Sequence, residues 1–119
     1  MAITLSTIIL FVHNLERLKQ FYTNHFHLTV KEEIPGEWVL LHAGSCDLGL
    51  HKASHGPGNT LAETNTKLVF DIEEDLDKLR DQLLSEHVDM KEIKQWAGYP
   101  YRMCDGTDPE GNVFQLLES

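Results

Sequence analysis

His51 is the side chain of this sequence best suited to contact a ligand. It belongs to the run Asp47–Lys52, in which Leu48 and Leu50 alternate with Gly49 and His51. Successive side chains of a β-strand point to opposite faces, so a strand here directs the leucines to one face and His51 to the other. Histidine as a residue type changes charge near neutral pH. His51 is therefore a candidate for a polar ligand contact or a general base. The alternative is a half-buried histidine bonded to a backbone carbonyl.

Three other large side chains have the chemistry to recognise an organic molecule. Arg102 carries a planar guanidinium, which can hold a ligand carboxylate through two hydrogen bonds or form an ion pair with the acidic surface. Trp38 and Trp96 can stack on a conjugated molecule or pack in the core. Three common catalytic or binding motifs are absent from the sequence: the serine nucleophile elbow, the phosphate-binding glycine loop and the H-E-x-x-H zinc motif.

The composition narrows the range of partners. The 119 residues include 10 Lys and Arg against 19 Asp and Glu, which gives a formal net charge of -9. Such a charge disfavours nucleic acid, whose phosphates require cationic side chains. Cys46 and Cys104 follow no secretory leader, and no run is long enough for a membrane span. We therefore expect a cytoplasmic protein with reduced cysteines and no membrane partner.

The elements that would position these side chains occur twice, about 60 residues apart. Strand-like Thr7–Val12 leads into a helix whose apolar stripe begins at Leu15, with Asn14 as its N-cap. Strand-like Lys67–Ile72 likewise leads into a helix with an apolar stripe. Three short strands are expected after each helix, at residues 28–34, 38–42 and 47–52 in the first repeat and 90–95, 101–104 and 112–117 in the second.

The repeat predicts a single domain, 1–119, built from two modules. Module one spans about 3–53, residues 54–66 form a linker of low apolar content, and module two spans about 67–119. Four acidic residues gather at the start of the second helix, between 73 and 77. Such a cluster more often complements the helix dipole in solvent than it binds a metal.

Two motifs at opposite ends of the chain resemble the vicinal oxygen chelate superfamily. Residues 12–17 read V-H-N-L-E-R and are followed by Phe21 and Tyr22, similar to the family's V-x-D-L-E-R…F-Y opening. Tyr-Arg at 101–102 and D-P-E-G-N at 108–112 are similar to its G-Y-R…D-P-D-G-N signature. The superfamily includes glyoxalase I, fosfomycin and bleomycin resistance proteins, and extradiol dioxygenases. The resemblance spans essentially the whole chain.

The resemblance implies an α+β fold of two βαβββ modules that form a cup-shaped mixed β-sheet with helices packed outside. It also implies a homodimer, because small family members commonly complete their cavities across a two-fold axis. By strand alternation, Phe11 would line the cup. In the family's metal enzymes, the first and last strands of each module carry the ligands. The matching positions in this sequence are Thr7, Gly49, Lys67 and Gln115.

These four positions do not favour a metal ion. Divalent cations prefer carboxylate, imidazole or amide oxygen donors, and of the four residues only Gln115 offers one of these groups. We therefore expect no metal or other cofactor and a small organic ligand. The predicted contact residues are Phe11, Trp38, His51, Arg102 and Gln115. The function expected is sequestration in an apolar cleft, as in bleomycin resistance proteins.

Two catalytic alternatives remain open. One is a divalent-metal-dependent lyase, isomerase or dioxygenase of the same superfamily, for example with a displaced ligand set of His42, His51 and Gln115. The other is metal-free acid–base catalysis by His51, for which the sequence offers no clear second partner.

Overall fold

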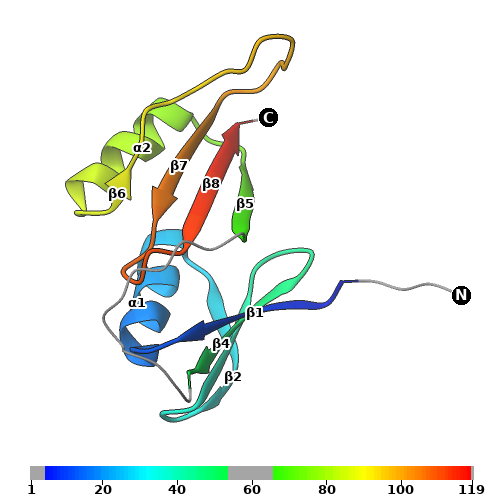
Figure 1. The fold of residues 1–119 in the computed structure, drawn as a ribbon, viewed down its shortest axis with the longest axis vertical. Helices are drawn as coiled ribbons and strands as arrows, with labels where there is room; N and C mark the ends of the chain where they lie inside the picture. Colours follow the sequence, from blue (N-terminus) through cyan, green and yellow to red (C-terminus); the bar gives the residue numbers. More distant parts are fainter. Residues whose placement is uncertain (1–4, 54–65, 119) are drawn as a thin grey trace, which may run out of the picture. The chain divides into compact units, whose positions relative to one another are not determined.

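The structure of the protein is a computed structural model that describes residues 5–53 and 66–118. The expected linker, apart from Thr66, lies outside the described residues. The chain divides into two compact units, Met1–Thr60 and Leu61–Ser119, and each is described by itself. The predicted α+β fold of two βαβββ modules is confirmed (Figure 1).

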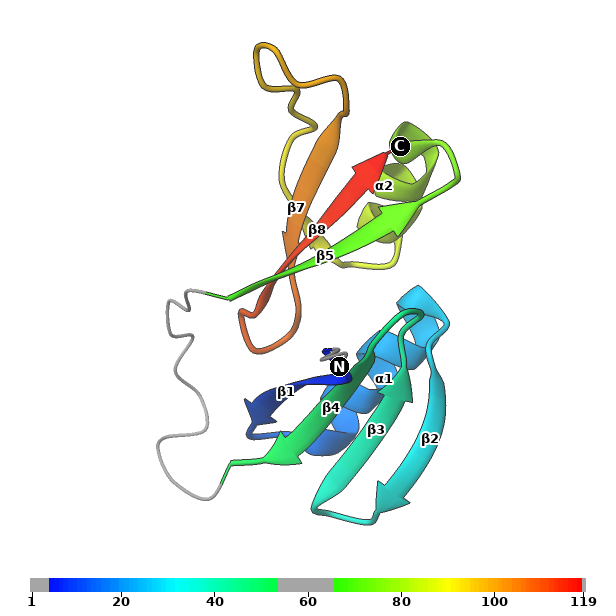
Figure 2. The same ribbon diagram turned by 90° about the vertical axis from the view of Figure 1, so that its right-hand side faces the viewer.

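Unit 1 is a four-stranded mixed sheet with one helix on one of its faces (Figure 2). The strands lie in the order β1-β4-β3-β2, with β1 parallel to β4 and the other neighbours antiparallel. The elements are β1 Thr7–Val12, α1 Leu15–Phe26, β2 Thr29–Ile34, β3 Trp38–His42 and β4 Asp47–Lys52.

Unit 2 repeats this arrangement, with strand order β5-β8-β7-β6 and β5 parallel to β8. The elements are β5 Lys67–Ile72, α2 Leu76–Ser85, β6 Asp89–Met90, β7 Met103–Thr107 and β8 Val113–Glu118.

The predicted strands at 90–95 and 101–104 were wrong in their bounds. β6 has only two residues, after which the chain touches β7 at a single bridge between Lys94 and Met103. The chain then turns, because the Tyr99 N–H donates to the Trp96 carbonyl over 3.0 Å and Gly98 has a φ of +79°. β7 consequently begins at Met103 and extends to Thr107. The segment 91–102 is thus a long connection along the edge of unit 2.

The duplication extends to the hydrogen-bond register. Thr7 pairs with Asp47 in unit 1, and its counterpart 60 positions later, Lys67, pairs with Val113. The antiparallel pair Leu40 and Gly49 corresponds in the same way to Asp105 and Gln115. The residues of β1, β3 and β4 therefore have counterparts at the same register positions in β5, β7 and β8.

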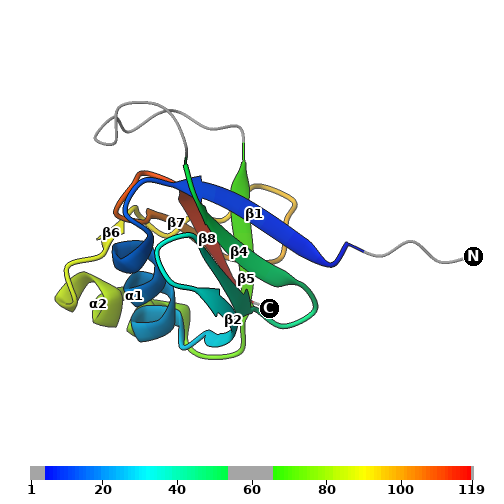
Figure 3. The ribbon, with the colours of Figure 1, turned by 90° about the horizontal axis from the view of Figure 1, so that it is seen from below.

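The first helix begins after its expected N-cap, Asn14, and the second begins after Asp75. Each helix covers one face of its own sheet (Figures 2 and 3). The Asn14 side chain accepts a hydrogen bond from the Arg17 N–H over 3.0 Å. Asp75 accepts from the N–H groups of Asp77 and Lys78, so one member of the acidic cluster is a cap. No helix within 5–53 and 66–118 is long and apolar enough to cross a membrane.

Each core lies between the helix and the covered face of its sheet. Fully buried members include Leu18, Tyr22 and Leu50 in unit 1 and Leu83 and Phe114 in unit 2. The side chains at alternating positions point to the opposite, helix-free face. The candidate site residues that belong to strands lie on these helix-free faces. Arg102 precedes β7 and belongs to no strand.

Candidate functional site

An aromatic row crosses the helix-free face of unit 1. Phe11 on β1 and Trp38 on β3 are both register partners of His51 on β4. The ring centroids of Phe11 and His51 lie 5.5 Å apart, and those of Trp38 and His51 lie 6.0 Å apart. Three predicted contact residues are therefore brought together. We call Phe11, His51 and Trp38 the aromatic row.

The row offers both an apolar surface and one polar group. Phe11 is 68% exposed although it is a large apolar side chain. His51 Nδ1 lies 2.8 Å from the Lys52 carbonyl oxygen. If Nδ1 carries the proton and donates to this oxygen, the neutral ring presents Nε2 as a hydrogen-bond acceptor. The predicted contact of His51 with a backbone carbonyl is therefore present. It orients the imidazole ring, which stays exposed.

Gly49 lies directly beneath the indole of Trp38. A Cβ atom at position 49 would lie 2.5 Å from Cη2 and 2.9 Å from Cζ3 of that ring, well inside van der Waals contact. The absence of a side chain at Gly49 is therefore what allows the indole of Trp38 to approach β4 so closely. An indole occupies the space where a side chain at position 49 would project.

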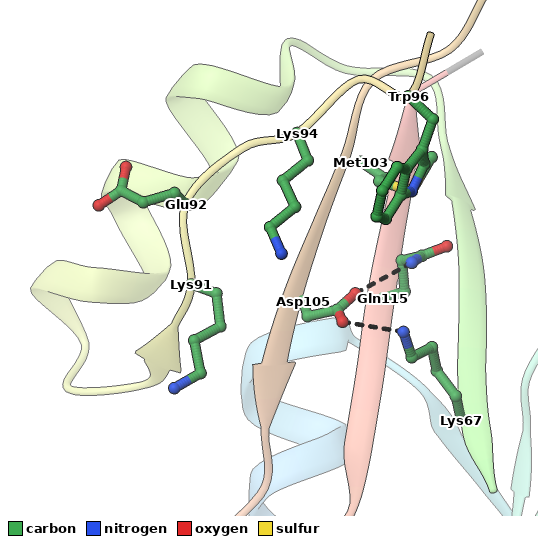
Figure 4. Close-up of a pocket in the computed structure, with 8 residues that line it drawn as sticks. All are labelled: Lys67, Lys91, Glu92, Lys94, Trp96, Met103, Asp105 and Gln115. Atoms are coloured by element: carbon green, nitrogen blue, oxygen red, sulfur yellow. Dashed lines mark hydrogen bonds and ion pairs between the residues drawn. The ribbon is translucent and has the colours of Figure 1, made fainter. Parts of the chain in front are cut away.

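The corresponding face of unit 2 carries an ionic cluster instead. Asp105 on β7 accepts hydrogen bonds from Lys67 Nζ over 2.9 Å and from Gln115 Nε2 over 3.0 Å (Figure 4). Burial raises the pKa of the Asp105 carboxyl, but the hydrogen bonds from Lys67 and Gln115 outweigh it, and the net pKa is lowered. We call Lys67, Asp105 and Gln115 the ionic cluster.

A cavity of about 80 Å³ lies over the ionic cluster. The connection 91–102 forms one side of it, and Figure 4 shows Lys94 extending from this segment toward Asp105, with Trp96 beside Met103. The cavity is lined by Lys67, Lys91, Glu92, Lys94, Trp96, Met103, Asp105 and Gln115. It is much smaller than the 300–1,000 Å³ of typical drug-sized pockets. Its size suits a small head group.

Three of these lining residues were singled out from the sequence: Lys67 and Gln115 by their positions, and Trp96 as an aromatic side chain. Asp105 was missed because β7 was expected to end at residue 104. Lys91 and Lys94 were missed because the segment was expected to be a regular strand. Alternation extended by one residue beyond Cys104 would have placed Asp105 on the same face as Met103.

Arg102 lies outside both groups and binds within unit 2. Its Nε donates to Glu118 Oε1 over 2.9 Å, and its Nη2 donates to Asp77 Oδ2 over 2.9 Å and to Glu118 Oε2 over 3.0 Å. These bonds raise the pKa of Arg102 and lower that of Glu118. Glu118 also accepts from the Leu76 N–H at the start of α2. The sequence left open whether Arg102 binds a ligand carboxylate or forms an ion pair with acidic side chains, and the structure contains the ion pair.

His42 does not join His51 in a displaced metal site. The two residues lie at opposite ends of the β3–β4 pair, where His42 is the partner of Asp47 and His51 the partner of Trp38. Four residues of strand separate them, which corresponds to about 13 Å. Ligands of one ion all lie within about 2.6 Å of it, so the two imidazoles cannot share a metal.

The sequence matches the Glyoxalase/Bleomycin resistance protein/Dioxygenase superfamily over residues 4–116, so the chain belongs to this superfamily. Members of the superfamily bind small molecules. A search of curated protein sequences found no match.

Solved structures with the same fold include three proteins of different description. Lactoylglutathione lyase from Agrobacterium tumefaciens has a TM-score of 0.77 at 19% identity, over 98% of this chain and 93% of that one. A variant of the fosfomycin resistance protein FosX from Listeria monocytogenes, complexed with Mn(II) and 1S,2S-dihydroxypropylphosphonic acid, has a TM-score of 0.80 at 21% identity, over 98% and 90%. An integron cassette protein from the mobile metagenome of Halifax Harbour sewage outfall has a TM-score of 0.81 at 18% identity, over 98% of each chain.

The residues of this chain do not fit a divalent ion of the kind bound by the Listeria protein. Gly49 has no donor and lies under an indole, and the Lys67 ammonium already binds the carboxylate of Asp105. An ammonium beside a divalent cation is repelled by it. Within 5–53 and 66–118, no three His, Cys, Asp or Glu side chains are grouped to hold a metal.

Proposed function

We propose that this chain binds a small organic molecule without a metal ion. The proposal is supported by the residue types at the four positions that match the metal-ligand positions of the family. Two of them are occupied by groups unsuited to coordination, because Trp38 covers Gly49 and Lys67 is paired with Asp105. A protein of this superfamily with such residues retains shape and hydrogen bonding as its means of holding a ligand.

In unit 1 the ligand contacts we propose are the three residues of the aromatic row. In unit 2 we propose Gln115 as a separate contact. Phe11 and Trp38 provide flat apolar area, and such area is favourable to remove from water. His51 Nε2 provides one directional hydrogen bond. Arg102 serves α2 instead, because its guanidinium is already bound to Asp77 and Glu118.

The test uses the two indole N–H signals of the protein in a ¹H–¹⁵N correlation spectrum, since the chain has only Trp38 and Trp96. A panel of aromatic fragments and small 2-oxo compounds is titrated, with Trp38→Phe used to assign the signals. We expect ligands that shift the Trp38 signal to bind about tenfold more weakly to His51→Ala, which corresponds to the loss of about one hydrogen bond.

His42→Ala is the matched control, because His42 also lies on the helix-free face but at the far end of the strand pair. Its affinity should match that of the unchanged protein. Equal affinity of His51→Ala and the unchanged protein for every fragment found would remove His51 from the site. A fragment panel that leaves the Trp38 signal unmoved throughout would count against the aromatic row.

The rival function is the divalent-metal-dependent lyase, isomerase or dioxygenase. Elemental analysis of protein purified without chelators separates the two functions. We expect Fe, Mn, Ni and Zn at well below one equivalent per chain. One equivalent of metal ion per chain, together with an activity that chelation abolishes, would favour metal-dependent catalysis over metal-free binding.

A homodimer is part of the proposal, on the strength of the family resemblance alone. Light scattering coupled to size-exclusion chromatography should give twice the chain mass. The chain mass itself, constant over the concentration range, would contradict the dimer and leave the ligand contacts in each unit to be tested as above.

A further inference from the structure

The cavity of unit 2 is unusual for so acidic a chain. The protein carries a formal net charge of -9, with only 10 Lys and Arg residues in total. Three of those ten line this one small cavity, namely Lys67, Lys91 and Lys94. The two carboxylates of the lining are Glu92 and Asp105, so the cavity itself has an excess of positive charge.

Both carboxylates of the cavity already have cationic partners. Asp105 pairs with Lys67, and Glu92 Oε1 lies 3.5 Å from Arg80 Nη2. Among the residues that the structure describes, neither Lys91 nor Lys94 makes an ion pair or a side-chain hydrogen bond. Lys94 nevertheless lies close enough to Asp105 to lower the pKa of that carboxyl. The ammonium that extends toward the ionic cluster without an ion pair among the described residues is therefore that of Lys94.

The other lining residues supply a place for the rest of a ligand. Trp96 is 62% exposed and lies beside Met103 at the end of the cavity opposite Lys67 (Figure 4). An indole and a thioether form an apolar, polarisable surface for a planar group. Gln115 Nε2 is held by Asp105, which fixes the amide plane of Gln115 above β8.

We propose that this cavity binds the anionic head group of a flat organic acid. The carboxylate would lie beside the Lys94 ammonium, and the planar group would lie against Trp96. The volume of about 80 Å³ admits a carboxylate but leaves most of an aromatic acid outside, on the indole.

This inference deepens the proposed function and rests on it, because Gln115 belongs to both. The two can fail separately, since Trp38 reports on the aromatic row and Trp96 on the cavity. The probes are benzoate and benzamide, which share a planar shape and differ in charge. In the spectrum of the full chain, we expect benzoate to shift the Trp96 indole signal and to bind at least tenfold more tightly there than benzamide.

Two substitutions move the affinity in opposite directions. Lys94→Met removes an unpaired positive charge and should weaken benzoate binding three- to tenfold. Asp105→Asn removes the competing carboxylate from Lys67 and should strengthen it by a similar factor. Lys78→Met is the matched control, because it makes the same change of charge on α2 outside the cavity, and its affinity for benzoate should be unchanged.

Several results would overturn the anion site. Equal affinity for benzoate and benzamide would show that the charge of the ligand is not recognised. A Trp96 signal that benzoate leaves unmoved would place the probe elsewhere. Equal losses of benzoate affinity in Lys94→Met and Lys78→Met would show that the affinity depends on the net charge of the protein and not on the cavity. If fragments still shift Trp38 in any of these cases, the proposed function stands and only the anion site falls.

Discussion

The substitution Gly49→Ala tests whether the position of the Trp38 indole requires a glycine at position 49. The added Cβ would lie 2.5 Å from Cη2 and 2.9 Å from Cζ3 of Trp38, and 3.2 Å from Cγ1 of Ile9. Carbon atoms attract one another at about 3.5–4.0 Å. The ring must therefore move away from β4 by about 1 Å, or rotate into solvent. Either response disrupts the aromatic row.

The cost in stability should be modest. Overpacking a well-packed core costs about 1–3 kcal/mol. Trp38 is only half-buried, so its ring can move without straining the backbone, and we expect about 1 kcal/mol, the low end of that range. With a urea m-value of about 2 kcal/mol/M, the denaturation midpoint falls by about 0.5 M. The indole fluorescence should move to longer wavelength as water reaches the ring.

Gly44→Ala is the control for Gly49→Ala. Gly44 has a φ of +99° and no atom within 4 Å of the position that a Cβ would take. Its substitution costs about 1 kcal/mol of backbone strain without touching Trp38. The two variants should thus be similarly destabilised, but only Gly49→Ala should move the Trp38 indole signal. An unmoved Trp38 signal in Gly49→Ala, or equal movement in both variants, would refute the packing described for β4.

Three further predictions concern unit 2. Arg102→Gln should lower the urea midpoint and speed amide exchange at the first turn of α2, because Glu118 then loses its guanidinium partner; unchanged exchange there would contradict this role. Asp105→Asn should cost less than about 1 kcal/mol at pH 7, since the carboxylate is a third exposed. Because the folded pKa of Asp105 is lowered, its carboxylate stabilises the folded state at pH values above the unfolded pKa of about 3.9, and this stabilisation is lost as the pH falls through the folded pKa. The urea midpoints of this variant and the unchanged protein should therefore converge as the pH falls below about 4. Burial raises the pKa of the Cys104 thiol, so iodoacetamide should label Cys46 in the folded protein and Cys104 only on unfolding, as read by mass spectrometry.

Strand bounds were predictable where a run of β-branched and apolar residues is enclosed by turn or cap residues. Thr7–Val12, Trp38–His42, Asp47–Lys52 and Lys67–Ile72 agree with the structure residue for residue. The region 90–104 was not predictable, because its aromatic and apolar residues favour a strand while Gly98 and the turn beginning at Trp96 redirect the chain. Local propensity could not reveal that this segment forms one side of a cavity.

The candidate site was predictable only within single strands. Alternation placed Gly49 and His51 on one face and Phe11 on the corresponding face of β1. The contact of Trp38 with His51, and its position over Gly49, depend on the register between β3 and β4. Register is set by turn geometry and by packing of the whole sheet, neither of which a single strand contains.

The two units show how far chemistry can diverge on one backbone pattern. Leu40 pairs with Gly49 in unit 1, and the equivalent pair in unit 2 is Asp105 with Gln115, in the same register. Gly49 of the first pair lies under an indole, and the second pair is hydrogen-bonded and joined to Lys67. Backbone pairing is therefore preserved while the side chains are exchanged, so the fold alone does not decide what either face binds.

Each unit lacks a metal-ligand side chain for a different reason. Unit 1 would need a donor at position 49, and that donor has room only if Trp38 is made smaller. Unit 2 would need Lys67 replaced by a neutral or acidic donor, which in turn leaves Asp105 without its cation. Because each change first removes an interaction that the present structure contains, a single substitution such as Lys67→His should not confer tight binding of Mn²⁺. An isothermal titration with Mn²⁺ that found sub-micromolar affinity in this variant would show that the remaining side chains are better ligands than their chemistry indicates.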